Sequence, residues 1–230
     1  MRVLNTRPRE QAGELSRLLR LSGFEPVEVP AIEVISAVDS GDLAKIGQHL
    51  QAGDYAWIVF SSANAAKFLD LPLGAAPVLC GTATASSLGV RPAIMLERFS
   101  AQAALETLEP LVQPGQRVLI PRAAESRDEL TSGLRELGVV VDAPVCYRTV
   151  AANIPAWEPV DVITLCSPSA VSALVAAWSA VAVNRSRVVC LGTTTADAAG
   201  VADVRVDATA RSTSMSALVA AVDSLVGARA

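Results

Sequence analysis

The chain repeats itself, and this internal repeat restricts the fold more than any other feature of the sequence. Four blocks recur in the same order and at similar separations. The longest pair is Arg2–Val34 and Arg117–Val150, which begin RVLNTRP and RVLIPRA. The others are Trp57–Leu69 with Val162–Leu174, Val78–Val90 with Val188–Val201, and Ser100–Leu105 with Thr213–Leu218. These ordered matches predict an internal duplication whose period is too long for a solenoid.

Each copy alternates short apolar runs with helical patterns. The runs are rich in Val and Ile and are apolar throughout, as strands covered on both faces are. In the first copy they are Val3–Asn5, Val27–Pro30, Trp57–Phe60, Val78–Cys80 and Ile94–Leu96. In the second copy they are Val118–Ile120, Val139–Tyr147, Val162–Cys166, Val188–Leu191 and Val204–Val206. The alternation predicts an α/β protein with two flavodoxin-like, doubly wound parallel sheets.

The composition indicates a globular chain and excludes several functions. Of the 230 residues, 51% are hydrophobic and 18% are charged, which supplies ample core material. The net charge of −4 and the dispersed basic residues argue against nucleic-acid binding. The beginning, MRVLNTRPRE, lacks the apolar core of a signal peptide, and the longest apolar stretch, Ala170–Val183, is too short to cross a bilayer. We therefore expect a soluble, cytoplasmic protein that binds neither nucleic acid nor membrane.

Few residues in the sequence are suited to holding a metal or a cofactor. Cys80, Cys146, Cys166 and Cys190 lack metal-ligand spacing, and we expect them to be small buried side chains. The single histidine, His49, lies at the end of a polar helical pattern. Neither GxGxxG after the first strand nor GxxxxGK followed by Ser or Thr occurs. We expect neither a metal site nor a nucleotide cofactor.

Gly, Arg and small hydroxyl residues follow the predicted strands. The carboxyl ends of parallel strands meet at one edge of the sheet, where ligands bind. The turns at this edge read NTRP, FSSAN, CGTAT, IPRAAESR, CSPS and LGTTT. Ser167-Pro168 and Gly192–Ala196 each begin a predicted helix, and the free N–H groups of a helix start bind anions. Single turns of this kind cap helices in any α/β protein, but their repetition in both halves favours a cleft for carboxylates or phosphates.

Two hinges and one tyrosine complete the pattern. The predicted hinges are residues 30–42 and 147–159, each of which follows a matching predicted strand. Two crossings between domains make one domain discontinuous. Tyr147 lies at the second hinge, and its residue type alone favours a packed interdomain aromatic ring whose hydroxyl is hydrogen-bonded.

The ordered set of turns resembles uroporphyrinogen-III synthase. The motifs are TRP (Thr6–Pro8), FSSANAAKF (Phe60–Phe68), CGTATA (Cys80–Ala85), RVLIPRAAESRDEL (Arg117–Leu130), CYRTV (Cys146–Val150), SPSAV (Ser167–Val171) and LGTTTA (Leu191–Ala196). They run through nearly the whole chain at compatible spacing. The sequence departs from the family pattern at Ala123, where Gly is frequent, at Cys146, where Val is usual, and in the short segment 69–77.

The resemblance implies two flavodoxin-like domains, joined by a two-stranded linker, with a cleft between them. One domain would contain residues 1–35 and 150–230, and the other residues 36–149. The implied reaction closes hydroxymethylbilane to uroporphyrinogen III, with inversion of ring D and loss of water, in tetrapyrrole biosynthesis. No cofactor or metal is implied. The substrate is a polycarboxylate, which agrees with the anion-binding turns, and the upstream bilane-forming enzyme is a further partner that the resemblance allows.

The resemblance also assigns roles to individual residues. Tyr147 matches the family tyrosine that is proposed to assist departure of the substrate hydroxyl. A phenol is a hydrogen-bond donor at neutral pH. The other matching residues are expected to bind substrate carboxylates, partly through backbone N–H groups. They are Thr6, Arg7, Ser61, Ser62, Asn64, Thr82, Thr84, Arg122, Ser167, Ser169, Thr194 and Thr195. For Arg7 and Arg122, a solvated surface charge is an equally good interpretation.

Two other functions fit the sequence. One is a non-catalytic protein of two domains that closes around an anion. The other is a regulatory domain related to the synthase, which the absence of a second module and of a basic patch disfavours. We take a monomer as the default state.

Overall fold

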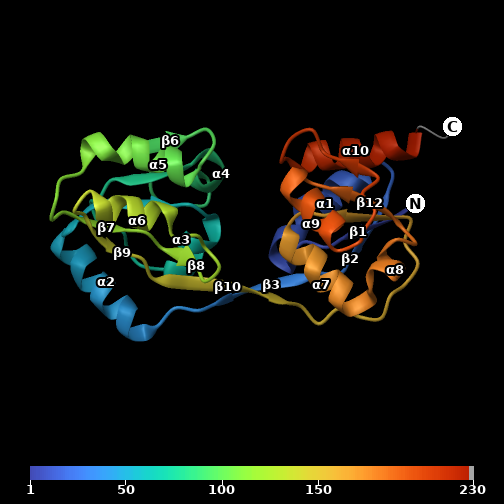
Figure 1. The fold of residues 1–230 in the computed structure, drawn as a ribbon, viewed down its shortest axis with the longest axis horizontal. Coiled ribbons are helices and arrows are strands. Elements are labelled where there is room, and N and C mark those ends of the chain that lie inside the picture. Colours follow the sequence, from blue (N-terminus) through green and yellow to red (C-terminus); the bar gives the residue numbers. More distant parts are fainter. Residues whose placement is uncertain (228–230) are drawn as a thin grey trace. The chain divides into compact units, whose positions relative to one another are not determined.

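The computed structural model describes residues 1–227, apart from the side chain of Ala83. The chain divides into two compact units. The terminal unit contains residues 1–33 and the chain from Val150 onward, and the central unit contains residues 34–149. In Figure 1 the blue amino-terminal strands accordingly share one body with the orange and red carboxyl-terminal elements.

The terminal unit is built around one parallel sheet. Its strands are β1 (Arg2–Asn5), β2 (Glu25–Glu28), β11 (Val162–Leu165), β12 (Arg187–Cys190) and β13 (Ala208–Thr209), in the spatial order β13-β12-β11-β1-β2. Its helices are α1 (Arg9–Leu21), α7 (Pro168–Trp178), α8 (Ala180–Val183), α9 (Thr193–Val201) and α10 (Met215–Gly227). All neighbouring strands run parallel. Numbered along the unit, the strand order is 2-1-3-4-5, as in flavodoxin, and the predicted α/β class is confirmed.

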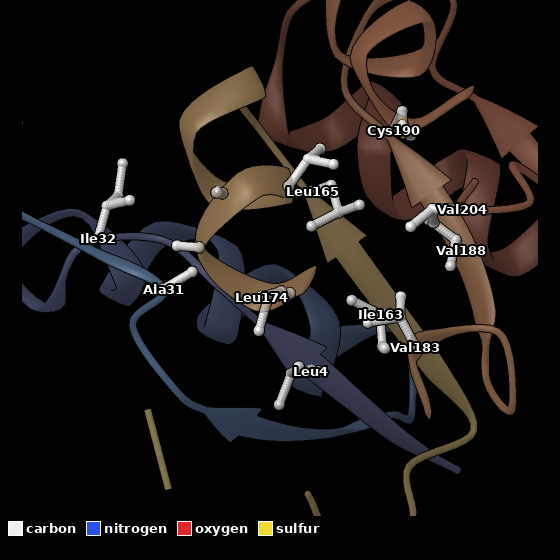
Figure 2. Close-up of a cluster of buried hydrophobic side chains, with 14 of the residues drawn as sticks. Leu4, Ala31, Ile32, Ile163, Leu165, Leu174, Val183, Val188, Cys190 and Val204 are labelled. Carbon is white, nitrogen blue, oxygen red and sulfur yellow. The ribbon is translucent and has the colours of Figure 1, made fainter. Parts of the chain in front are cut away.

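Both faces of this sheet are buried, which explains why its strands are apolar throughout. Leu4, Ile163 and Val188 belong to one hydrophobic cluster, together with Leu174 of α7. Figure 2 shows these four side chains on the same face of the sheet. The preceding or following residues, such as Val3 and Val162, belong to a second cluster with α1 and α10. Successive strand residues point to opposite faces, so each strand supplies both layers.

The central unit repeats this architecture. Its sheet contains β4 (Tyr55–Phe60), β5 (Val78–Gly81), β6 (Ile94–Leu96), β7 (Arg117–Leu119) and β9 (Val140–Asp142), in the order β6-β5-β4-β7-β9. The strands are again parallel. Its helical elements are α2 (Ser40–Ala52), α3 (Ala63–Leu69), α4 (Thr82–Ala85), α5 (Ala101–Leu108), η1 (Glu109–Leu111) and α6 (Glu129–Glu136). Ile58 and Val59 point into two different hydrophobic clusters, so this sheet is also covered on both faces.

The chain passes between the units through two paired strands. These are β3 (Ile32–Ser36) and β10 (Val145–Ala151), and β8 (Arg122–Ala123) completes their sheet. The Ala37 N–H donates to the Cys146 carbonyl, and the Ala152 N–H donates to the Ala31 carbonyl, each at 3.0–3.1 Å. The residue numbers rise along one strand and fall along the other, so the pair is antiparallel.

Two predicted strands differ from the observed ones. Val204–Val206 is not a strand, because the Asn184 side chain accepts a hydrogen bond from the Arg205 N–H and donates one to the Asp203 carbonyl. The chain joins β12 only at Ala208–Thr209. The predicted strand Val139–Tyr147 is divided into β9 and β10 by Ala143 and Pro144.

Two further predictions can be compared with the described residues. No helix within residues 1–227 is long and apolar enough to cross a membrane. Within the same residues, no group of three or more His, Cys, Asp or Glu side chains is placed to hold a metal ion.

Candidate active site

The carboxyl-terminal edge of the sheet in the terminal unit carries six of the predicted site residues. Thr6 and Arg7 follow β1, Ser167 and Ser169 follow β11, and the LGTTT turn follows β12. These strands are parallel neighbours, so the turns leave the sheet on the same side.

Helix α7 begins with a pair of hydroxyl groups. The Ser167 Oγ accepts a hydrogen bond from the Ala170 N–H at 3.2 Å, which caps the helix. The Ser169 hydroxyl lies 3.0 Å from the Ser167 hydroxyl and is exposed. The helix start therefore presents a hydroxyl pair to solvent.

Helix α9 begins differently, with glycine. Gly192 is the N-cap, and within the described part of the chain no side chain caps this helix. The first N–H groups of a helix have no partner inside it. Thr193 and Thr194 are exposed at this start, whereas the Thr195 side chain is buried. This helix start is consequently more open than the start of α7, the other predicted anion-binding position in the terminal unit.

Thr6 and Arg7 are engaged within the protein. The Thr6 side chain is 1% exposed, and its hydroxyl donates to the Thr164 carbonyl at 2.6 Å. The Arg7 guanidinium donates to the Gln11 side chain at 3.1 Å and contacts the sulfur of Met215. The structure thus places the Thr6 hydroxyl against strand β11, not among the exposed hydroxyls of the edge.

A cluster of serines at this edge was missing from the predicted site. The Ser214 Oγ lies 3.3 Å from the Ser212 Oγ and 3.1 Å from the Ser216 Oγ. It also accepts a hydrogen bond from the Ala217 N–H, which caps the start of α10. A side chain at Gly192 would lie 3.6 Å from Thr213, so this loop is beside the start of α9. The alternating serines, and the repeat block that begins at Thr213, are the sequence signal for this loop.

The equivalent edge of the central unit contains the predicted catalytic tyrosine. Tyr147 lies in β10 and is 9% exposed, and its ring stacks on Phe68 at 6.0 Å between ring centroids. Its hydroxyl lies 3.0 Å from the Ser62 Oγ. Ser62 is the N-cap of α3 and accepts a hydrogen bond from the Asn64 N–H at 3.1 Å. The structure therefore brings Tyr147, Ser62 and Asn64 together, with Ser61 exposed beside them.

The CGTAT turn of the central unit has fewer exposed hydroxyl groups than the matching LGTTT turn of the terminal unit. Thr82 is exposed and its hydroxyl donates to the Glu97 carbonyl at 3.3 Å, whereas the Thr84 side chain is buried. A side chain at Gly81 would meet the Cβ of Phe99 at 3.0 Å. Helix α4 has only four residues, so this turn offers a much shorter helix start than LGTTT does.

Arg122 borders a cavity of about 240 Å³ in the central unit. Ser61, Phe99 and Leu130 line the same cavity. The guanidinium is bound to the Asp128 carboxylate and to the Ser126 carbonyl. The hydrogen bond from Arg122, and secondly its positive charge, hold the pKa of Asp128 below its usual range. Arg122 is thus tied to the loop that forms the cavity wall.

A second polar cluster in the central unit lies outside the predicted site. Arg117 binds the Asp142 carboxylate at 2.8 Å, and the Tyr55 hydroxyl donates to the same carboxylate at 2.8 Å. Burial, and secondly the hydrogen bond to Asp142, raise the pKa of Tyr55 above its ordinary value. Lys45 and His49 border an adjoining cavity of about 320 Å³, and the His49 Nδ1 lies 2.7 Å from Asp54. This cluster joins β4, β7 and β9 and has no exposed hydroxyl pair comparable to that at α7.

A comparison of the sequence with models of protein families shows the family of this chain. Residues 13–220 match the family model described as uroporphyrinogen-III synthase HemD. The chain belongs to the uroporphyrinogen-III synthase family. Most of the predicted site residues lie within the matched region.

Two relatives illustrate the similarity. Over 221 residues the chain is 28% identical to the porphyrin biosynthesis protein HemD of Ruminiclostridium josui, covering 86% of this chain and 43% of that protein. Over 147 residues it is 26% identical to a putative uroporphyrinogen-III synthase of Methanocaldococcus jannaschii, covering 58% of each protein. The chain thus spans about half the length of these relatives.

Solved structures of uroporphyrinogen-III synthases share the fold. The Helicobacter pylori enzyme gives a TM-score of 0.65 at 16% identity, with 97% of this chain and 98% of that one covered. A mutant enzyme from Thermus thermophilus gives 0.60 at 16% identity, with 99% of both chains covered.

Proposed function

We propose that this protein is a uroporphyrinogen-III synthase, which converts hydroxymethylbilane to uroporphyrinogen III in tetrapyrrole biosynthesis. The observation that carries the proposal is the family match across residues 13–220. We also propose that the two compact units act as separate domains, residues 1–35 with 150–230 and residues 36–149. The protein would act as a cytoplasmic monomer on the product of the upstream bilane-forming enzyme.

The edges of the two sheets support the binding of a polycarboxylate. The hydroxyls of the half-buried Ser167 and the exposed Ser169, and the uncapped start of α9, suit carboxylates in the terminal unit. Ser61 and Thr82 are the exposed hydroxyl residues of the corresponding turns in the central unit. Carboxylates held by backbone N–H groups depend little on any one side chain, so we expect single substitutions among these residues to have mild effects.

Tyr147 supports the first chemical step. In this step the bond between the hydroxymethyl carbon on ring A and its oxygen breaks, and the oxygen keeps the electron pair. Tyr147 would donate its proton to that oxygen, which leaves as water. The resulting azafulvene is attacked by the substituted carbon of ring D to give a spiro intermediate. The intermediate fragments and recloses with ring D inverted, and the proton released at closure restores the phenol.

Orientation is the main contribution expected from the protein. Hydroxymethylbilane closes by itself to the uninverted type I isomer, so the enzyme must hold the substrate in the geometry that leads to inversion. The hydroxyl residues that follow the strands at the edge of each sheet support this role. No metal or redox cofactor enters this proposed reaction.

The test is to supply fresh hydroxymethylbilane to the purified protein, oxidise the products and separate the uroporphyrin isomers. We expect mainly type III, with type I in the enzyme-free control. Type I alone in both samples would contradict the proposal. Equilibrium binding of the bilane without type III formation would instead support a non-catalytic, anion-binding protein.

A further inference from the structure

Ser62 makes two hydrogen bonds that connect the predicted catalytic tyrosine to the start of a helix. Its Oγ accepts from the Asn64 N–H at 3.1 Å and lies 3.0 Å from the Tyr147 hydroxyl. A serine hydroxyl has one hydrogen and two acceptor lone pairs. Because one lone pair is used by the Asn64 N–H, the hydroxyl hydrogen and the second lone pair are both available to Tyr147.

The contact between Ser62 and Tyr147 can form in either direction. Without substrate, the phenol donates to the Ser62 Oγ. When the phenol donates to another oxygen, the Ser62 hydroxyl rotates and donates to the phenol oxygen instead. The distance of 3.0 Å suits both arrangements, and no heavy atom has to move.

The surroundings hold the Tyr147 ring in the place that this exchange requires. The ring stacks on Phe68 with an interplanar angle of 25°. The Tyr147 carbonyl accepts a hydrogen bond from the Ala124 N–H at 2.9 Å, which fixes the backbone of β10 beside β8. The phenol oxygen therefore stays within reach of Ser62.

Within the described residues, two other serines that cap helices, Ser100 and Ser167, lack a phenol as partner. Ser100 caps α5 through the Ala103 N–H at 3.0 Å, and its side chain is exposed. Ser167, which matches Ser62 in the sequence repeat, has the Ser169 hydroxyl as its neighbour. The combination of helix cap and phenol is thus specific to Ser62 among these three serines.

We infer that Ser62 is a positioning residue that donates a hydrogen bond to the Tyr147 oxygen while Tyr147 protonates the departing hydroxyl of the substrate. This inference rests on the proposed synthase function. As the phenol proton moves to the leaving oxygen, negative charge develops on the phenol oxygen. The Ser62 hydroxyl then donates to an ionised acceptor, and such hydrogen bonds are stronger than neutral ones. Ser62 itself loses no proton.

The experiment compares Ser62→Gly with Ser62→Thr. Glycine is tolerated at N-caps with little loss of stability, so Ser62→Gly removes the donor and largely preserves the helix start. Threonine keeps both the cap and the hydroxyl. We expect kcat for type III formation to fall about tenfold in Ser62→Gly with KM nearly unchanged, and to recover in Ser62→Thr. Ser100→Gly, which removes a cap serine in the same unit, should keep the wild-type kcat.

A double-mutant cycle separates positioning from a purely structural role. If Ser62 acts through Tyr147, Ser62→Gly should change kcat little in a Tyr147→Phe background. The same tenfold loss in both backgrounds, or an unchanged kcat in Ser62→Gly, would overturn the inference while leaving the proposed function intact. A wild-type protein that forms only type I product would overturn both.

Discussion

The two units share one sheet order but differ in what stands at the edge of the sheet. Strands that match in the sequence repeat, such as β1 with β7 and β12 with β5, occupy equivalent places in the two sheets. When the strands of each sheet are numbered along the chain, the spatial order is 2-1-3-4-5 in the terminal unit and 3-2-1-4-5 in the central unit. The numbers differ because the first strand of the central sheet along the chain is β4, which matches the third strand of the terminal sheet, β11. This agreement supports the proposed duplication. It also means that the differences between the two edges come from the side chains and helix starts that follow the strands, and not from the places of the strands in the sheet.

The clearest difference concerns β3 and β10. Two of the hydrogen bonds between these strands run from the Ala37 N–H to the Cys146 carbonyl and from the Ala152 N–H to the Ala31 carbonyl. Each bond becomes the other when Ala31 is matched with Cys146 and Ala37 with Ala152. The same correspondence matches Ile32 with Tyr147. Both side chains are nearly buried, at 8% and 9% exposure. At matching positions of the two linker strands, the terminal unit therefore has an aliphatic side chain and the central unit has a phenol. Only the central unit has the candidate proton donor at this position.

The largest expected effect is loss of that phenol. Tyr147→Phe should lower the rate of type III formation about 100-fold, because general acid assistance is lost while the ring still stacks on Phe68. Ile32→Val in the terminal unit should keep the wild-type rate. Steady-state kinetics with isomer analysis measures both. A Tyr147→Phe protein with full turnover would show that the hydroxyl has no chemical role.

The equivalent glycines Gly81 and Gly192 give the next contrast. Gly81→Ala should destabilise the protein by about 1–3 kcal/mol, since the new Cβ would overpack against Phe99. Gly192→Ala should cost about 1 kcal/mol or less, because its Cβ would make an ordinary 3.6 Å contact with Thr213. Urea unfolding at neutral pH would measure both changes. Equal losses would mean that the packing around the two turns is alike.

A smaller effect is expected at alkaline pH from Tyr55. Its pKa is raised in the folded protein, so its contribution to stability is complete below the unfolded pKa near 10 and is lost as the pH rises further. Val160 stands at the matching place of the terminal unit and has no proton to lose. We expect Tyr55→Phe to cost about 1 kcal/mol at neutral pH and to flatten the fall in stability above about pH 10.

Unfolding midpoints measured from neutral to alkaline pH would test this. Parallel profiles for wild type and Tyr55→Phe would contradict the prediction.

The smallest effect concerns the cysteines. Cys80 and Cys190 occupy equivalent strand ends, and both are fully buried. Burial raises the pKa of Cys190 to about 12 and that of Cys146 to about 11. At pH 8 we expect slow alkylation of the half-buried Cys166 and almost none of the other three, as mass spectrometry would show. Rapid labelling of Cys80 or Cys190 would reveal frequent opening of that sheet.

Much of the fold could be predicted from the sequence, because its strands are buried on both faces. Runs such as Val162–Cys166 are apolar at every position, and this pattern is visible without a structure. The prediction of a strand at Val204–Val206 was wrong, because the backbone of this run is hydrogen-bonded to the Asn184 side chain, which is distant in sequence. Strands β3 and β8 were not among the strands predicted from apolar runs, because their short segments become strands by pairing with β10, and only the family resemblance implied a two-stranded linker.

The site was predictable in residue type but not in geometry. The sequence predicted Ser167 as the cap of a helix, because an N-cap is a local feature, whereas Ser62 was predicted only as a substrate-binding residue. The contact between Ser62 and Tyr147 joins residues far apart in the chain, and no local pattern encodes it. Thr6 shows the converse. Its motif suggested an exposed hydroxyl, but its hydroxyl is used to bond β1 to the neighbouring strand.

The place of the central unit within the chain has a consequence for biosynthesis. Val3 pairs with Val162, whereas every strand pair of the central sheet is formed within residues 55–142. During translation, β1 and β2 emerge before the central unit and lack their neighbour β11 until after it. At about 5–20 residues per second, this delay lasts on the order of ten seconds. The central unit can complete its own sheet on the ribosome during this interval, so strands that are made before the central unit complete their sheet after it.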